Sequence, residues 1–389
     1  MTAVTDTDAL PRKALAGPFG GLFCGYLGLT AAIPVLPGFV RDRYAAADFL
    51  VGSVVTATAL TALLIRPVAG SQADARGYRS VMRAGAVLVL LGGLGYFLPL
   101  GLAGLVVDRL LLGVGEAALF TAGAVWTVSL APHDRRAQLI GLYGVSMWGG
   151  ITVGTFLGAV LKQFGYHAVW TLCVAAPLLA LALISSVPST AHQPTGTRRG
   201  GILPRTTIAP GIALALAAGG YASLAAFVVL HLQARHIPNG VVVLSCFSAV
   251  YAGTRLVIGR FPDRYGPRRV ATVCAIGEAA GLLIIAVAPS LPVAIAGSLV
   301  MGVGFSLLHP SLALMVMNRT DKSQQGAALG AYTSFWDLGV ALWGPVGGLV
   351  AGGLGYPAVF VVGAGCALVS AVMALLIAEP TARPVAVAG

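Results

Sequence analysis

Charged side chains are scarce in this chain. Only 10% of its 389 residues are Asp, Glu, Lys or Arg, whereas soluble globular proteins carry about 25%. The same chain is 57% hydrophobic, and its mean hydropathy is +0.89. This combination excludes an ordinary soluble domain and indicates that most of the chain lies in lipid.

Patterns that bind metals or build enzyme active sites are also missing from the sequence. All five cysteines lie inside apolar runs, with no CxxC or His/Cys spacing, so we expect no metal and no cofactor. No Ser/His/Asp set and no phosphate-binding loop is present, which argues against a membrane-embedded enzyme. The formal charge of +11 comes without a basic-aromatic surface, so we expect no nucleic-acid partner.

Short alternating segments typical of a membrane β-barrel are absent, and the apolar residues come in long runs instead. About 20 such residues cross the ~30 Å hydrocarbon core as a helix. We therefore predict an all-α membrane protein with twelve spans, near residues 15–39, 47–68, 80–99, 103–130, 137–163, 167–187, 207–233, 239–258, 270–288, 291–317, 325–352 and 356–377.

One polar segment divides the spans into two sets of six. The stretch that begins at Pro188 is rich in Pro, Gly, Ser, Thr and Arg, a composition typical of linkers. We predict an N-terminal bundle over 14–187, a cytoplasmic linker over 188–206 and a C-terminal bundle over 207–378.

The basic residues predict the orientation. With the N-terminus in the cytoplasm, eighteen Lys and Arg fall on the inner side, Arg66 among them, and four on the outer side. Cytoplasmic loops of membrane proteins carry such an excess. Both termini are therefore predicted to be cytoplasmic. The many arginines, with few lysines, fit a GC-rich bacterial genome and hence a bacterial inner membrane.

The chain also carries an internal repeat. A shift of 189 residues places Arg66 on Arg255, and it matches the Gly, Asp, Gly and Arg of one polar loop to those of another. The same shift places the "GVG" at 113–115 on the "GVG" at 302–304. Parallel six-helix repeats are a transporter architecture, with the substrate site between the halves.

The two repeated loops carry a family resemblance. "RPVAGSQADARGYRS" and "RLVIGRFPDRYGPRR" resemble the loop signature of the major facilitator superfamily, and "RLLLGVGEAA" is similar to its fourth-helix motif. The resemblance implies two pseudo-symmetric six-helix bundles and loops that latch the cytoplasmic side when it closes. The predicted latch residues are Gly70, Asp74, Gly77, Arg79, Gly259, Asp263, Gly266 and Arg268.

Within that superfamily the chain is most similar to bacterial proton-coupled drug and sugar efflux permeases. One motif departs from their pattern. "GITVGTFLGA" in the fifth span keeps the glycine spacing of the antiporter motif but lacks its proline. This departure weakens the inference of antiport, and close helix packing explains the glycines equally well.

Ionisable groups inside spans are costly in lipid and usually face a cavity or a partner. Arg109 and Glu116 share one face of the fourth span. A buried carboxyl group near an arginine can exchange a proton, because desolvation and the cation act on its proton affinity in opposite senses. The resemblance implies that Arg109 assists proton coupling. The alternative is a structural pair that only fixes helix packing.

Three further ionisable residues lie in the second half. Asp337 in the eleventh span is a second candidate for proton coupling, unless it only bonds an unwound backbone or a serine of the eighth or tenth span. His309 precedes Pro310, which should kink the tenth span. It is either a substrate or proton ligand, or a packed neutral side chain. Glu278 in the ninth span is interpreted as structural.

Aromatic side chains near the expected cavity are candidates for substrate contact. They are Tyr26, Phe120, Tyr143, Trp148, Tyr221, Tyr251, Tyr332 and Trp336. A flat aromatic lining with few charges suits amphipathic or cationic molecules, and it also suits sugars.

These features together predict a secondary active transporter that works by alternating access. We expect a monomer in the lipid bilayer that exchanges protons for a small organic solute, most readily by efflux of a drug-like compound, sugar or metabolite. A proton symporter or uniporter that imports a sugar or organic acid is the near alternative. A transport-inactive membrane sensor is a more distant one.

Overall fold

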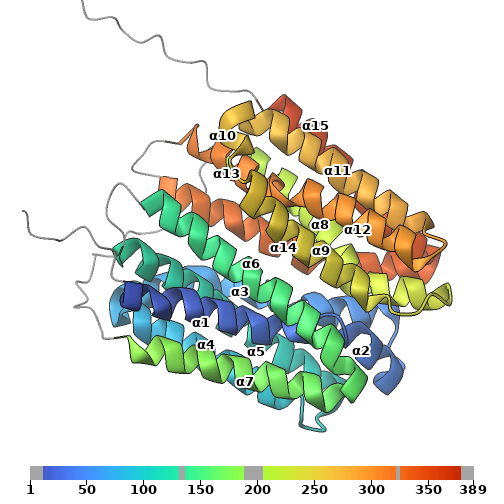
Figure 1. Cartoon of the computed structure of the whole chain (residues 1–389), viewed down its shortest axis with the longest axis horizontal. Coiled ribbons are helices and arrows are strands. Elements are labelled where there is room, and N and C mark those ends of the chain that lie inside the picture. Colours follow the sequence, from blue (N-terminus) through green and yellow to red (C-terminus); the bar gives the residue numbers. More distant parts are fainter. Residues whose placement is uncertain (1–11, 131–135, 188–204, 321–324, 378–389) are drawn as a thin grey trace, which may run out of the picture.

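The computed structural model describes residues 12–130, 136–187, 205–320 and 325–377. Within these ranges the chain forms fifteen α-helices and one short 3-10 helix, and no strand (Figure 1). Long apolar runs without polar interruptions must close their backbone hydrogen bonds internally in lipid, which a helix does. The all-helical fold that the sequence predicts is therefore confirmed.

The first half contains the helices before residue 188. They are α1 (Arg12–Ala31), α2 (Leu36–Tyr44), α3 (Asp48–Arg76), α4 (Tyr78–Gly95), α5 (Gly101–Leu130), α6 (Arg136–Leu161), the 3-10 helix η1 (Lys162–Phe164) and α7 (Tyr166–Ser186).

The second half begins with the long helix α8 (Arg205–Ala234). It continues with α9 (Val241–Ile258), α10 (Phe261–Tyr265), α11 (Pro267–Val287), α12 (Leu291–Ser306), α13 (Leu308–Met317), α14 (Gln325–Leu354) and α15 (Tyr356–Leu376). Residues 188–204 of the predicted linker lie outside the described residues, and α8 already begins at Arg205.

Two of the predicted spans are each formed by two helices. The first breaks between Ala31 and Leu36, where Pro34 lacks the amide hydrogen that an unbroken helix needs. The tenth breaks at Leu307, three residues before Pro310, whose ring excludes a bond to the Ser306 carbonyl. If each pair counts as one span and the five-residue α10 is left aside, the described residues contain twelve long elements. Ten of them are long and apolar enough to cross a membrane.

The helices pack as two groups (Figure 1). In the first, α1 lies against α5, α6 and α7, and α3 and α4 lie against α5; we name α1–α7 the N-terminal bundle. In the second, α8 lies against α14 and α15, and α11 against α12 and α15; we name α8–α15 the C-terminal bundle. Contact between the bundles comes mainly from α3 on α14 and from α6 on α9.

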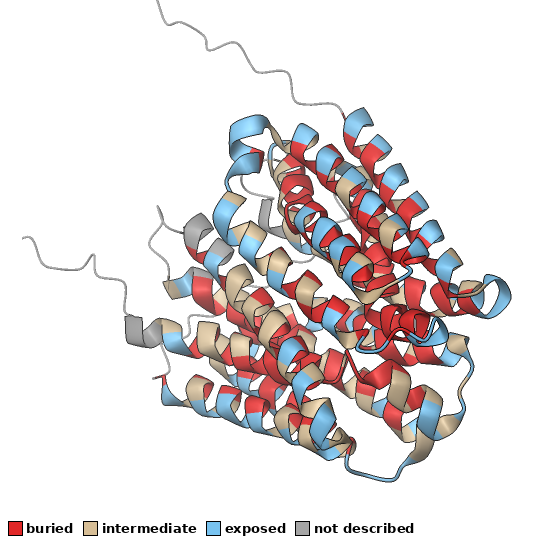
Figure 2. Cartoon of the chain, turned by 45° about the vertical axis from the view of Figure 1, so that its right-hand side comes forward, coloured by how far each residue is buried: buried red, intermediate tan, exposed pale blue. Residues whose placement is uncertain are grey.

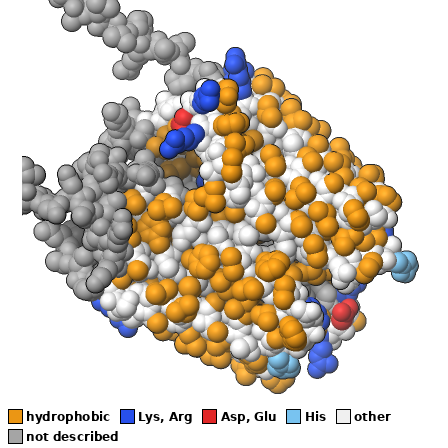
Figure 3. All heavy atoms as spheres, in the orientation of Figure 1, with side chains coloured by type: hydrophobic (Ala, Val, Ile, Leu, Met, Phe, Trp, Pro, Cys, Tyr) orange, Lys and Arg blue, Asp and Glu red, His pale blue; other side chains and the backbone are white. Residues whose placement is uncertain are grey.

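The outer faces of both bundles expose apolar side chains. Val257 is 83% exposed and Leu64 is 63% exposed, and Figure 2 shows buried positions concentrated where helices face one another. Figure 3 shows hydrophobic atoms across the middle of the molecule and charged groups toward its two ends. We name the end where α1 begins and α15 finishes the terminal end, and the opposite one the distal end. An apolar belt between charged ends is the surface that a bilayer requires.

The repeat seen in the sequence recurs in matched contacts. The Tyr143 hydroxyl donates to the carbonyl oxygen of Phe120 at 3.0 Å, and the Tyr332 hydroxyl donates to that of His309 at 2.9 Å. Each member of the second pair lies 189 residues after its counterpart. Because this tyrosine-to-carbonyl contact recurs at the shift of the sequence repeat, the two bundles share this element of their internal structure.

The first predicted latch loop is shorter than the sequence suggests. Helix α3 continues through Arg76, so Gly70 and Asp74 are helical, and their placement in a loop is wrong. The chain turns only at Gly77, whose φ of 89° is accessible to glycine at little cost. Arg79 then donates to the carbonyl oxygens of Ile184 and Ser185, which end α7 of its own bundle.

The second predicted latch loop is a true connection. Gly259 ends α9 with helical angles, and Asp263 lies in the short helix α10. Gly266 has a φ of 88°, which matches Gly77. Arg268 follows in the first turn of α11. The two glycines with positive φ, rather than the whole segments, are therefore the conserved geometric element of this repeat within the chain.

Candidate functional site

An ion pair joins the two bundles in the middle of the molecule. Arg66 of α3 donates from Nε to Oδ2 of Asp337 on α14, and from Nη2 to Oδ1 at 3.0 Å. The side chains are 11% and 2% exposed. The partner of Asp337 is thus an arginine of the other bundle, and neither a serine nor an unwound backbone.

Arg66 is a site residue that the sequence interpretation missed. The sequence interpretation counted it among the charges of the cytoplasmic side, whereas the structure buries its side chain between the bundles, against Asp337 of α14. The guanidinium carbon lies 5.0 Å from the centroid of the Phe120 ring. Its Nη1 has no hydrogen-bond partner among the described residues. An ionisable residue inside a predicted span was the signal that could have identified it.

Glu116 lies in the same region on α5. Its Oε1 accepts a hydrogen bond from the hydroxyl of Tyr26 on α1 at 3.2 Å, and Arg66 and Asp337 both act on it electrostatically. We name Tyr26, Arg66, Glu116 and Asp337 the charged cluster. It contains two carboxyl groups and one cation, so it is electrically neutral only when one proton is bound.

Arg109 does not join this cluster directly. Its Nη2 donates to the Val55 carbonyl oxygen at 2.7 Å and its Nε to that of Val54 at 3.2 Å, both on α3. Its Nη1 donates to the Tyr96 hydroxyl at 3.3 Å. The side chain is fully enclosed, and no ion pair between it and Glu116 occurs within the described ranges. Arg109 therefore ties α5 to α3 inside the N-terminal bundle.

Four of the predicted substrate-contact residues meet where the bundles face each other. The rings of Trp148 and Tyr251 lie 3.8 Å apart between centroids, and Tyr221 and Trp336 lie 5.4 Å apart. Phe305 contacts Trp336 at 5.6 Å and was not predicted. We name these five residues the aromatic cluster. Because Trp336 precedes Asp337 in α14, the aromatic and charged clusters adjoin.

The remaining predicted residues serve other roles in this structure. Tyr143 and Tyr332 are buried, and both use their hydroxyl groups to satisfy main-chain carbonyls. His309 packs its ring 5.2 Å from Tyr332 at the start of α13. Phe120 lies under Arg66, and Tyr26 bonds Glu116. These contacts explain why not every predicted aromatic side chain reaches the cluster.

Glu278 is enclosed within the C-terminal bundle, away from the charged cluster. Its side chain has no exposed surface, and neither carboxyl oxygen has a hydrogen-bond partner among the described residues. A methyl group added at Gly220 of α8 would collide with Oε1 of Glu278. No cluster of three or more His, Cys, Asp or Glu that could hold a metal ion occurs in the part of the chain that the structure describes.

The bundles touch closely at the distal end. Gly344 and Gly348 of α14 lie against the first turns of α3, where an added methyl group would collide with Thr56 or with the main chain of Asp48. Asp48 Oδ1 accepts from the hydroxyl of Tyr356 at 2.7 Å, and Tyr356 also accepts from Arg41. Small residues allow this approach of two helices.

A chain with paired helical bundles, an apolar belt and ionisable groups at the interface has the features of a multi-pass membrane transporter. The sequence profile described as the Major Facilitator Superfamily matches residues 19–244 and 211–388. The chain belongs to the major facilitator superfamily.

Two curated relatives agree with this assignment. An uncharacterized MFS-type transporter of Salmonella typhimurium is 32% identical over 367 residues, which cover 92% of this chain and 94% of the relative. An uncharacterized MFS-type transporter of Burkholderia mallei is 32% identical over 375 residues, which cover 93% of this chain and 91% of the relative.

Two solved structures share the fold at low sequence identity. The human organic anion transporter MFSD10 aligns with a TM-score of 0.70 at 20% identity and covers 93% of this chain and 99% of its own. The nucleoside transporter NupG aligns with a TM-score of 0.76 at 13% identity, with the same coverage. These identities support the fold alone.

Proposed function

We propose that this protein is a proton-coupled exporter of a small amphipathic solute, located in a bacterial inner membrane as a monomer with both termini in the cytoplasm. The observation that carries the proposal is the charged cluster. Asp337 is neutralised by Arg66, whereas Glu116 has only a tyrosine hydroxyl. A carboxyl group in a low-dielectric site needs a proton or another cationic partner.

This shortage of positive charge favours antiport. A proton on Glu116 and a cationic group of the solute near it neutralise the same carboxylate, so the two exclude each other. Mutually exclusive binding is the condition under which a proton gradient drives a solute in the opposite direction. The adjoining aromatic cluster supplies faces on which a planar cation or a sugar ring can stack.

The remaining polar groups complete the proposal. The unpartnered Nη1 of Arg66 is available to an acceptor atom of the solute. Arg109 acts as a positioning residue, because it holds α5, which carries Glu116, against α3, which carries Arg66. The close distal contact between α3 and α14 is what a state closed toward the outside requires, and the same helices must separate when access alternates.

The test is proton release on ligand binding. Purified protein in weakly buffered detergent, with a pH-sensitive dye, is titrated with ethidium as a planar cation and with D-xylose as an uncharged pentose. We expect one of the two ligands to release protons from the wild-type protein on binding. Neither ligand should release protons from Glu116→Gln. Glu278→Gln is the matched control, since this carboxyl group lies outside the cluster. Proteoliposomes with an imposed pH gradient then measure flux.

Three results would contradict the proposal. Flux that ignores the pH gradient would remove proton coupling and leave a uniporter. Flux in which solute and protons move in the same direction would make the protein a symporter and remove efflux. Ligand binding without flux in any gradient would indicate a membrane sensor.

A further inference from the structure

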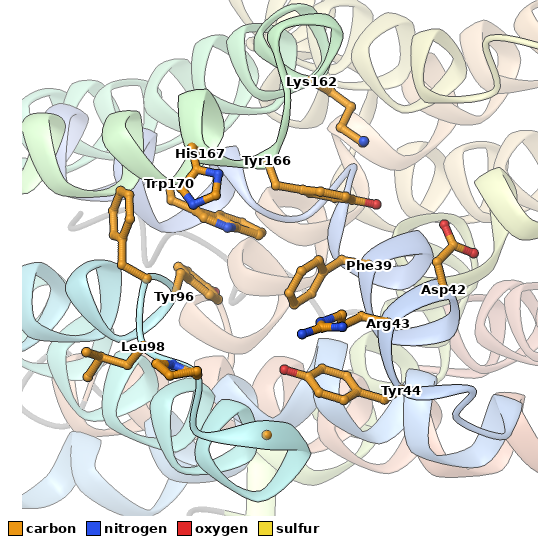
Figure 4. A pocket seen from close by; sticks show the side chains of 13 residues that line it. Phe39, Asp42, Arg43, Tyr44, Tyr96, Leu98, Lys162, Tyr166, His167 and Trp170 are labelled. Atoms are coloured by element: carbon orange, nitrogen blue, oxygen red, sulfur yellow. The ribbon is translucent and has the colours of Figure 1, made fainter.

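A cavity lies within the N-terminal bundle, apart from the interface between the bundles. Its volume is about 760 Å³, and the residues that line it belong to α2, to the connection between α4 and α5 with the first residue of α5, or to η1 and the start of α7. These segments meet at the distal end (Figure 4). Since no residue of the aromatic or charged cluster lines it, this cavity is distinct from both clusters. Its size is that of a site for a drug-sized molecule.

The inner wall of the cavity is built from stacked rings. Tyr96 lies parallel to Trp170, with centroids 4.5 Å apart and planes 18° apart. Trp170 also stacks on Tyr166 at 5.9 Å and 16°, and Phe39 meets Trp170 edge-on at 5.4 Å. Tyr96 and Trp170 are buried, so the wall is held in place before any ligand arrives. A preformed aromatic wall favours a planar apolar group.

The rim of the cavity is predominantly basic. Arg43 from α2, Lys162 from η1 and His167 from α7 line it, with Asp42 as its one acidic residue. The Lys162 ammonium is held 3.5 Å from the centroid of the Tyr166 ring. Figure 4 shows the Arg43 side chain turned toward the ring-lined space, whereas Asp42 lies at its edge. Two permanent cations at the mouth of an aromatic wall favour an anionic group on the ligand.

We propose that this cavity is an accessory binding site for a small aromatic carboxylate. The ring of the ligand stacks on the wall formed by Tyr96 and Trp170, and its carboxylate lies between Arg43 and Lys162. The wall has a direct connection to the transport helices, because the Tyr96 hydroxyl accepts a hydrogen bond from Arg109, which also bonds α3. A ligand bound at the distal end is therefore linked, through Tyr96 and Arg109, to α3, the helix that carries Arg66.

The test is direct binding to the full chain in nanodiscs of zwitterionic phosphatidylcholine, measured by calorimetry. The probe is 2-naphthoate, and uncharged 2-naphthalenemethanol is its matched control. We expect naphthoate to bind about tenfold more tightly than the alcohol, because only the anion gains charge-assisted hydrogen bonds. Arg43→Gln combined with Lys162→Gln should remove this preference. Arg235→Gln, at the distal end of the C-terminal bundle, should leave it unchanged.

Further arms separate the possible causes of a negative result. Arg43→Lys should retain the preference for the anion because it keeps the charge, and unchanged binding of the alcohol by the double variant shows that the double variant has not merely misfolded. Glu116→Gln should leave naphthoate binding unchanged, so this site stands or falls independently of proton coupling. Equal affinities for acid and alcohol, or no loss in the double variant, would overturn the proposal. So would loss of binding in nanodiscs of anionic phosphatidylglycerol, which would make a lipid the occupant.

Discussion

The ion pair between Arg66 and Asp337 should stabilise the state in which the distal end is closed. Asp337→Asn keeps the shape of the side chain and removes its charge. The carboxylate is 2% exposed and takes two donors from Arg66. Breaking a buried pair from one side costs about 3–5 kcal/mol. We expect about 3 kcal/mol, because Glu116 can take up part of the arginine's charge. This is roughly a hundredfold shift toward a state without the pair.

Distance measurements between spin labels would report the shift. Labels at Leu98 and Gln233, two exposed positions at the distal ends of the two bundles, should move apart in Asp337→Asn in a background without other reactive cysteines. Asp42→Asn, which removes an exposed carboxylate at the same end, is the control. In a double-mutant cycle with Arg66→Gln, we expect a coupling of about 1.5 kcal/mol or more. A coupling within about 0.5 kcal/mol of zero would refute the reasoning.

Two further predictions concern contacts away from the charged cluster. Gly344→Leu should prevent closure of the distal end, because the new side chain would collide with Thr56 and the Gly52 carbonyl. Cysteine pairs placed across the distal end should then fail to cross-link. Unchanged cross-linking would contradict this prediction. Arg79→Gln should lower the melting temperature by a few degrees, since it removes donors at the end of α7 worth about 1–2 kcal/mol. Arg83→Gln changes an exposed neighbour on α4 and should leave the melting temperature unchanged. Equal melting temperatures in the two variants would contradict the role assigned to Arg79 at the end of α7.

The fold was predictable because its signals are local. Runs of apolar residues determine helices in lipid, and Gly77 and Gly266 mark the same turn in each half. The division of the first span was not predicted, although Pro34 was visible in the sequence. The ends of helices were harder to predict from the sequence, because polar residues such as Asp74 continue α3 beyond the apolar run. A hydropathy pattern locates the part of a helix in lipid and not its extension into water.

The site was predictable in part, for a different reason. Asp337 and Glu116 were identified because a carboxyl group inside a span is costly and needs a function or a partner. Their partners were not identified, since Arg66 and Tyr26 lie on other helices. Arg109 shares a helix face with Glu116 but is taken up by main-chain carbonyls of α3. Spacing along one helix therefore shows which residues share a face and leaves open which helix covers it.

The repeat explains why one interface contains both a charged and an aromatic cluster. Arg66 and Arg255 are equivalent in the two halves, and a shift of 189 residues relates Trp148 to Asp337. In one half the arginine meets a carboxylate across the interface. In the other, Arg255 donates to the Tyr251 hydroxyl at 3.1 Å, and Tyr251 contacts Trp148.

Equivalent positions of the two halves thus form an ion pair in one half and an aromatic contact in the other. Glu116 and Phe305, which the same shift also relates, repeat this division. A symmetric pair of arginines with two carboxylate partners would hold the bundles together by two ion pairs and would have to break both in each cycle. With one ion pair and one aromatic contact, only the charged side has to change for the bundles to separate. Under the proposed proton coupling, this asymmetry of the repeat would allow a single proton to shift the balance between the two bundles.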